Sequence, residues 1–147
     1  MATFNLINDW LANMVENADL DSDQFVIALS NTAPGDEDPA VTGDGNGVIA
    51  NVTEVAYTHC SSRNITTTSS SQASGTYKLV LQDITLTASG GTVGPFRYVY
   101  VYDDTVASPA DPLVAYYDYG SSITLQDGET LEIDFDADNG LFQLASA

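Results

Sequence analysis

Positive charge is what this sequence has least of. Of its 147 residues only 3 are Lys or Arg, against 21 Asp and Glu, which gives a formal net charge of −18 with the single His neutral. Proteins that recognise DNA or RNA neutralise phosphates with Lys and Arg, and anionic membrane surfaces attract basic segments. The composition therefore argues against a nucleic-acid reader, and we expect neither nucleic acid nor a membrane as a partner.

Cysteine and long hydrophobic runs are also scarce. The single cysteine, Cys60, cannot form an internal disulfide, so we expect synthesis in a reducing compartment. No run approaches the roughly 20 apolar residues of a membrane-spanning helix, and the first residues lack the basic segment that begins a signal peptide. Apolar residues still make up 44% of the chain. We therefore expect one folded domain over residues 1–147 and not a disordered acidic tail.

One helix is expected, over residues 4–17, because apolar residues recur there at three- and four-residue steps. The apolar face of this helix would hold Phe4, Ile7, Trp10, Leu11, Met14 and Val15. A helix of this length is marginal when isolated. Its apolar face should therefore dock either on the protein's own sheet or on a neighbouring subunit.

Strand patterns dominate residues 24–145, which we expect to form a β-sandwich. The expected strands cover 24–30, 77–86, 96–102, 113–119, 123–125, 129–136 and 141–144, with loose alternation over 48–58. Residues 31–47 are acidic and rich in Gly and Pro, as in a surface loop, and Ser/Thr-rich residues 61–76 are either an exposed strand or a mobile segment. Asn139-Gly140 is a type I′ turn signal. Seven or eight short strands after one helix predict a mainly β fold, either an antiparallel β-sandwich or a jelly-roll-like barrel.

Residues with catalytic potential are few. His59 and Cys60 are adjacent, and neighbours on a strand point to opposite faces, so we expect a half-buried cysteine and an exposed histidine rather than a catalytic pair. Glu132, Asp134 and Asp136 alternate with apolar residues, as on the solvated face of a strand. Two such carboxylates could also serve a glycosidase. We favour the structural interpretation and expect no catalytic residues and no cofactor.

Two aspartate-rich runs, residues 19–23 and 134–140, raise the question of a calcium site, because hard cations prefer clustered oxygen ligands. Neither run has the spacing of an EF-hand loop. Aspartate is also a common turn former. We therefore expect loose counterions rather than a specific metal site, and calcium binding stays an alternative.

Tyrosines mark a candidate interaction surface. Tyr98, Tyr100 and Tyr102 would lie on one face of a strand with Val99 and Val101 on the other. Such a row is either cross-strand aromatic packing inside the sheet or an exposed contact surface, because tyrosine combines a large apolar area with a polar tip. The sequence leaves both interpretations open.

Arg97 is the cation best placed to contact a partner, because arginine is enriched among the residues that dominate binding interfaces. A local bridge from Arg97 to Asp103 or Asp118 is the alternative. With the helix face and the tyrosines, the candidate interface residues are Phe4, Trp10, Leu11, Arg97, Tyr98, Tyr100 and Tyr102.

Short sequence motifs follow one another in a characteristic order in the C-terminal half. They are GPFRYV at 94–99, YDDT at 102–105, PL at 112–113, Tyr116, DYG at 118–120, DGET at 127–130, Ile133, Phe135 and GL at 140–141. In this order, with the short helix, the aspartate-rich turn and the FVIAL segment at 25–29, they resemble a small structural protein of tailed bacteriophages, of the head decoration (cement) type. The resemblance is weakest over 36–74.

The resemblance implies a virion component made in the bacterial cytoplasm. It would bind the major capsid protein on the capsid exterior and stabilise the shell, as a homo-oligomer with a trimer favoured. A tail, baseplate or head-fibre component that binds host-surface glycan is the alternative. The high negative charge suits docking on a basic surface, and the resemblance implies no catalytic residues.

Overall fold

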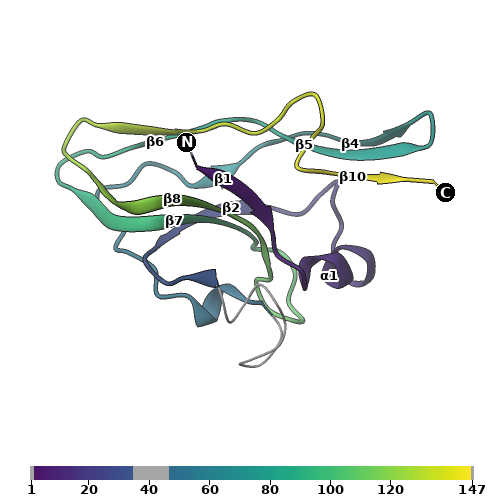
Figure 1. The fold of residues 1–147 in the computed structure, drawn as a ribbon, viewed down its shortest axis with the longest axis horizontal. Helices are drawn as coiled ribbons and strands as arrows, with labels where there is room; N and C mark the ends of the chain where they lie inside the picture. Colours follow the sequence, from purple (N-terminus) through teal and green to yellow (C-terminus); the bar gives the residue numbers. More distant parts are fainter. Residues whose placement is uncertain (1, 35–46, 147) are drawn as a thin grey trace.

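The computed structural model describes residues 2–34 and 47–146. It is mainly β, with two layers of antiparallel strands and one short α-helix near one end (Figure 1). The elements are β1 (Thr3–Leu6), α1 (Trp10–Glu16), β2 (Phe25–Ser30), a 3-10 helix (Ile49–Asn51), β3 (Asn64–Ile65), β4 (Thr67–Ala73), β5 (Thr76–Leu81), β6 (Ile84–Thr87), β7 (Val93–Asp103), β8 (Leu113–Leu125), β9 (Thr130–Ile133) and β10 (Phe142–Ala145). The expected sandwich class is confirmed, and the sheets are not closed into a barrel.

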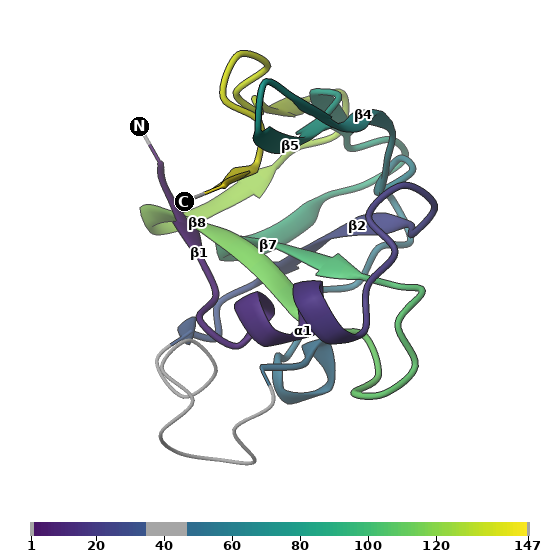
Figure 2. The same cartoon turned by 90° about the vertical axis from the view of Figure 1, so that its right-hand side faces the viewer.

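The larger layer is a five-stranded sheet in the order β1-β8-β7-β2-β3. Its central strand β7 is 11 residues long and its neighbour β8 is 13. β2 and the C-terminal half of β7 are buried on both faces, which explains why their sequences read as almost continuous apolar and aromatic runs. Figure 2 shows α1 across one end of this sheet.

The second layer consists of two small sheets, β10-β5-β4 and β6-β9. It covers one face of the larger sheet (Figures 1 and 2). The core draws fully buried side chains from both layers, including Phe25, Leu29 and Val99 from the large sheet and Leu79 and Leu86 from the small ones. In the described parts of the chain, no helix is long and apolar enough to cross a membrane.

The N-terminal segment corrects the prediction of one helix over residues 4–17. Residues Thr3–Leu6 form an edge strand on β8, with Phe4 opposite Tyr117, and the helix begins only at Trp10. The apolar spacing of this segment is compatible with either structure. The edge of β8 offers backbone hydrogen bonds to residues 3–6. The spacing of side chains in the sequence does not show that this edge is available.

Two strand predictions also change. Residues 48–58 contain a 3-10 helix and isolated bridges in place of a strand, and residues 123–125 continue β8. Residues 61–76 contain β3 and the largely exposed β4, as the exposed-strand interpretation predicted. Most of the predicted acidic loop 31–47 lies outside the described residues.

The Asn139-Gly140 turn is not the hairpin that its sequence indicates. A type I′ turn needs positive φ at both central residues, and only Gly140 has it, at 76°. β10 then pairs with β5 and not with β9. A Cβ atom at Gly140 would lie 2.6 Å from the carbonyl oxygen of Leu79, so the absence of a side chain lets the 134–141 segment pass close over β5.

Candidate functional site

Trp10 is not a surface residue. Its side chain is fully buried, and its ring meets that of Phe25 edge-on with centroids 6.2 Å apart. This part of the helix therefore packs on the protein's own sheet, which is one of the two arrangements expected from the sequence. Leu11, the next residue, is 54% exposed and stays available to a partner.

The tyrosine row is also internal. Tyr98, Tyr100 and Tyr102 are at most 8% exposed, and the Tyr100 hydroxyl donates to the carbonyl oxygen of Thr32 at 2.6 Å. Tyr116 joins them from β8, with its ring centroid 6.1 Å from that of Tyr100 and 6.5 Å from that of Tyr98. Cross-strand packing is thus the role that the structure shows, and we name Tyr98, Tyr100 and Tyr116 the closed aromatic cluster.

Arg97 makes a local bridge. Its Nε donates to Asp118 Oδ1 at 2.7 Å and its Nη2 to Asp118 Oδ2 at 2.9 Å, while its guanidinium carbon lies 5.1 Å from the Tyr98 ring centroid. Of the two aspartates considered, the partner is Asp118 and not Asp103. The hydrogen bonds from Arg97 lower the pKa of the Asp118 carboxyl, so this half-buried pair stays ionised.

The other two cations are held inside the chain as well. Arg63 lies 3.7 Å above the Tyr57 ring, donates to the carbonyl oxygen of Ile27 and is 3.7 Å from Glu54. Lys78 Nζ donates to the carbonyl oxygen of Asp138 at 2.7 Å. All 3 cations of the chain therefore have intramolecular partners. The carboxylates of Glu54 and Asp118 are the ion-pair partners of the two arginines.

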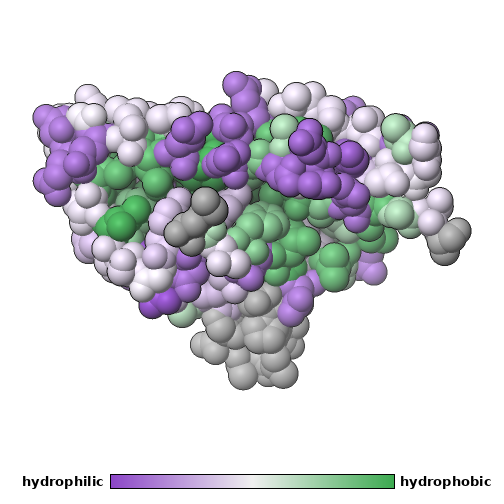
Figure 3. Space-filling model, turned by 45° about the horizontal axis from the view of Figure 1, so that its top comes forward, coloured by the Kyte–Doolittle hydropathy of each residue, from purple (hydrophilic) through white to green (hydrophobic). Residues whose placement is uncertain are grey.

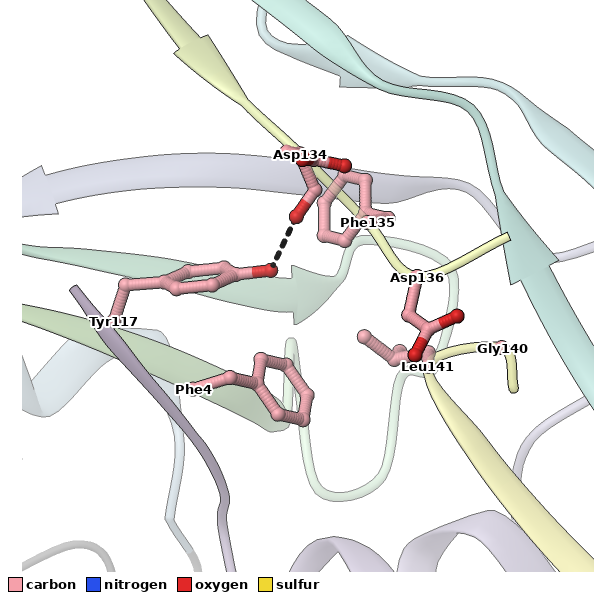
Figure 4. Close-up of a pocket in the computed structure, with 7 residues that line it drawn as sticks. All are labelled: Phe4, Tyr117, Asp134, Phe135, Asp136, Gly140 and Leu141. Carbon is pink, nitrogen blue, oxygen red and sulfur yellow. Dashed lines mark hydrogen bonds between the residues drawn. The ribbon is translucent and has the colours of Figure 1, made fainter. Parts of the chain in front are cut away.

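A hollow of about 270 Å³ opens where β1 and β8 meet the segment after β9 (Figure 4). We name it the aromatic pocket. Its lining residues are Phe4, Tyr117, Asp134, Phe135, Asp136, Gly140 and Leu141. The Phe4 and Tyr117 rings have centroids 5.3 Å apart and planes at 60°, and the Tyr117 and Phe135 rings are 6.3 Å apart at 57°. The three rings are mutually inclined and do not form a flat platform.

The polar groups of the aromatic pocket are fixed. The Tyr117 hydroxyl donates to the carbonyl oxygen of Asp134 at 3.1 Å, and burial, followed by the nearby negative charges, raises the tyrosine pKa. Asp136 accepts hydrogen bonds from the backbone N–H groups of Asp138 and Asn139 and from the Asn139 side chain. The bonds from Asn139 and Asp138 lower the pKa of Asp136. The pocket thus keeps a neutral phenol and a charged carboxylate.

A second hollow lies on the other side of Tyr117. Its lining residues are Ala2, Tyr117, Tyr119, Glu132, Ile133 and Asp134. Glu132, Asp134 and Asp136 are all exposed while Ile133 and Phe135 are buried, which confirms the predicted solvated row. The end of β9 therefore sets carboxylates beside aromatic rings on both sides of Tyr117.

An apolar patch lies nearby on α1 and β10. Its exposed members are Leu11, Val15 and Leu144, at 54%, 74% and 44%. Val15 and Leu144 line an open groove with Met14, Ala18, Leu20 and Tyr77, and Asp19 and Asp21 also line it. We name it the α1–β10 patch. Figure 3 shows hydrophobic surface gathered beneath a hydrophilic ridge.

The two aspartate runs serve as turns. Asp23 accepts a hydrogen bond from the backbone N–H of Asp19 at 2.8 Å, and Asp19 accepts one from that of Asp21 at 3.2 Å. Across the described ranges, no group of three or more His, Cys, Asp or Glu side chains is placed to hold a metal ion.

His59 departs from the prediction that it is exposed. It is half-buried, as is Cys60, and packs on the turn before β7: a Cβ atom at Gly91 would lie 2.5 Å from its Cδ2. Burial raises the pKa of the Cys60 thiol, which disfavours the thiolate that nucleophilic chemistry needs.

Comparison with known proteins gives no relative: no family model, no curated protein and no solved structure matches the chain. Of the seven candidate interface residues, Phe4 lines the aromatic pocket and Leu11 belongs to the α1–β10 patch. The sequence did not single out Tyr117, Phe135 and Leu141 as partners of Phe4, because the long-range pairing of β1 with β8 and the passage of the 134–141 segment over β5 bring them together.

Proposed function

We propose that this protein is a phage virion structural protein of the decoration type, which binds the outer capsid surface and stabilises the shell. The ordered sequence resemblance is one support for the proposal. The observation that carries it is electrostatic: every cation has an internal partner while the net charge is −18. A basic docking surface is the complement of such a protein.

The α1–β10 patch supplies the apolar part of the proposed contact. Exposed apolar groups that gather in one place mark interaction surfaces, whereas scattered ones are ordinary. Here Val15 and Leu144 come from elements distant in sequence and line the same groove, with Asp19 and Asp21 beside them. An apolar centre with an acidic border suits a protein surface of opposite charge.

The proposed mechanism is mechanical. A decoration protein binds the assembled shell better than its separated subunits, so its binding free energy adds to the stability of the assembled state. Contacts to neighbouring capsid subunits would produce this preference. No bond is made or broken, and we propose no enzymatic activity.

The first test is location in the intact particle. Purified virions would be imaged by cryo-electron microscopy, with copy number from mass spectrometry. We expect hundreds of copies at lattice junctions on the outer shell. A handful at the tail or at one vertex would overturn the capsid assignment and favour the glycan-binding alternative.

A second test asks which surface binds. The double variant Leu11→Asp/Val15→Asp should keep its fold, because both side chains are exposed, but should lose incorporation into particles. Ser89→Asp/Thr92→Asp is the matched control. It adds the same charge at exposed positions in the turn between β6 and β7, at the opposite end of the molecule from α1 (Figure 1). Equal incorporation of both variants would exclude the patch.

A tail or head-fibre module that binds glycan is the second candidate. The aromatic pocket is the observation behind it, because a tyrosine ring offers a ligand both apolar area and a polar tip. Glycan-array binding that is lost in Tyr117→Ala would support this function over capsid binding. Tyr100, in the closed aromatic cluster, is buried and cannot contact a glycan.

A further inference from the structure

The aromatic pocket is small, and it has room for one side chain. Its volume of about 270 Å³ lies below the range of roughly 300–1,000 Å³ typical of sites for drug-sized ligands. Its walls come from three separate parts of the chain, namely β1, β8 and the segment 134–141. The tight passage of Gly140 over Leu79 fixes the third wall against the sandwich.

The angles between the ring planes favour a ligand that contacts several inclined rings over one that stacks on a single flat face. Planes inclined at 60° and 57° offer no single flat surface, and Figure 4 shows Phe4, Tyr117 and Phe135 around one hollow. A sugar ring stacks best on one exposed flat face. A methylene chain that ends in a cation can contact several inclined faces, because the negative face of each ring attracts positive charge.

The charges of the pocket select the sign of the occupant. The exposed carboxylates of Asp134 and Asp136 line the hollow, and the hydrogen bonds to Asp136 keep it ionised. The cation that interacts with Asp136 is Lys78, and its ammonium group already donates to the Asp138 carbonyl. The aromatic pocket therefore has negative charge to complement and no cation of its own among its lining residues.

We propose that the aromatic pocket receives a lysine side chain of a protein partner, with the methylene stem against Phe4, Tyr117 and Phe135 and the ammonium group at Asp134 and Asp136. This inference rests on the proposed function for the identity of the partner, a capsid surface. The chemistry of the pocket is independent of that identity. It adds a specific anchor to the general attraction between an acidic protein and a basic surface.

The test is an NMR titration of the isolated protein with N-acetyl-lysine N-methylamide. The neutral control is N-acetyl-norleucine N-methylamide, which keeps a four-carbon side chain without the ammonium group. We expect shifts confined to the pocket residues and binding of the lysine probe about 3- to 30-fold tighter than that of the norleucine probe, the range that one cation–π contact supplies.

Two variants locate the effect. Asp134→Asn should weaken lysine binding about twofold to fivefold, as the loss of an exposed ion pair does, and leave norleucine binding unchanged. Asp104→Asn removes one charge from an exposed position in the loop after β7, outside the pocket lining, and should change neither. An unchanged amide spectrum away from the substitution would show that both variants are folded.

Three results would overturn the inference. Equal binding of the two probes would leave an apolar hollow without charge selection. Shifts with methyl glycosides but not with lysine would assign the pocket to glycan. No shift with any probe would exclude a ligand site. Because the titration uses the isolated protein, failure to find the chain on capsids would overturn the proposed function and leave the lysine result standing, and the reverse holds equally.

Discussion

Two aromatic clusters share strand β8 and differ in what covers them. The closed cluster, Tyr98, Tyr100 and Tyr116, lies on the face where Tyr100 bonds to Thr32. The aromatic pocket uses Tyr117, the next residue along β8, which points to the other face with Phe4 and Phe135. Consecutive residues thus have opposite roles, because side chains alternate across a strand.

Aromatic composition alone therefore does not identify a binding surface. Both clusters hold three rings at similar centroid distances. The closed aromatic cluster is covered by other parts of its own chain and stabilises the sheet. The rings of the aromatic pocket instead border a hollow lined by carboxylates. The covering of each cluster, and not its residue types, decides whether it is core or site.

The largest expected effect separates Tyr100 from Tyr117. Tyr100→Ala removes a fully buried ring and should lower the free energy of unfolding by about 3–5 kcal/mol. Tyr117→Ala removes a half-buried ring and should cost about 1–2 kcal/mol, while abolishing lysine binding in the pocket. Urea denaturation of both variants measures the difference. Equal losses of stability would mean that the pocket is structural core.

Carboxylates show the same contrast between covered and open positions. Asp103 is fully buried, and burial, with Asp23 nearby, raises its pKa to about 7 although two backbone N–H groups donate to it. The native state therefore binds more protons than the unfolded state between about pH 4 and 7. The contribution of Asp103 to stability is present at low pH and is lost as the pH rises through about 7.

Asp103→Asn imitates the protonated acid and should remove this pH dependence. Its amide oxygen can still accept the N–H groups of Thr105 and Val106, and its NH₂ group can donate to Asp23. At pH 8 we expect the variant to be more stable than the parent by about 1–2 kcal/mol. Thermal unfolding across pH 4–8 measures the effect. A parent curve without a fall over this interval would contradict the raised pKa.

Neighbours on α1 provide a smaller test of the same comparison. Trp10 is fully buried and Leu11 is 54% exposed. Leu11→Gln keeps a good helix former and should change the free energy of unfolding by less than about 0.5 kcal/mol, whereas capsid binding should weaken. A large loss of stability in a chemical denaturation curve would show that Leu11 packs inside the fold.

The smallest expected effect concerns Arg97 and Asp118. This pair is bidentate but lies at the surface, where solvent and salt screen ion pairs. Arg97→Gln should leave the unfolding midpoint nearly unchanged. NMR titration of Asp118 should show its lowered pKa returning toward the ordinary value. An unmoved Asp118 titration would contradict the hydrogen bonds from Arg97 as its cause.

The sequence predicted the strands that are largely buried, because their composition is almost entirely apolar or aromatic. Residues 24–30 and 96–102 are almost wholly apolar or aromatic and form β2 and β7. It failed where partners decide the outcome. The periodicity of Phe4 and Ile7 matched a helix, yet the edge of β8 captured Thr3–Leu6 as a strand. The Asn139-Gly140 pair indicated a hairpin, but β10 found its partner in β5.

The candidate site was predictable only in part. The solvated row of Glu132, Asp134 and Asp136 followed from alternation, and Phe4 was singled out as a contact residue for its apolar spacing. Their meeting depends on two long-range arrangements, β1 against β8 and the 134–141 segment against β5. No local pattern encodes either, so the pocket could not be predicted from the sequence.

The internal pairing of all three cations has a consequence for assembly. Copies of this chain present surfaces of one sign to one another, so added salt should strengthen contacts between copies by screening their mutual repulsion. The proposed contact with a basic shell should instead weaken as salt is added. Ionic strength thus acts in opposite directions on the two kinds of contact. At low salt, neighbouring copies would therefore be positioned by their contacts with the shell and not by attraction to one another.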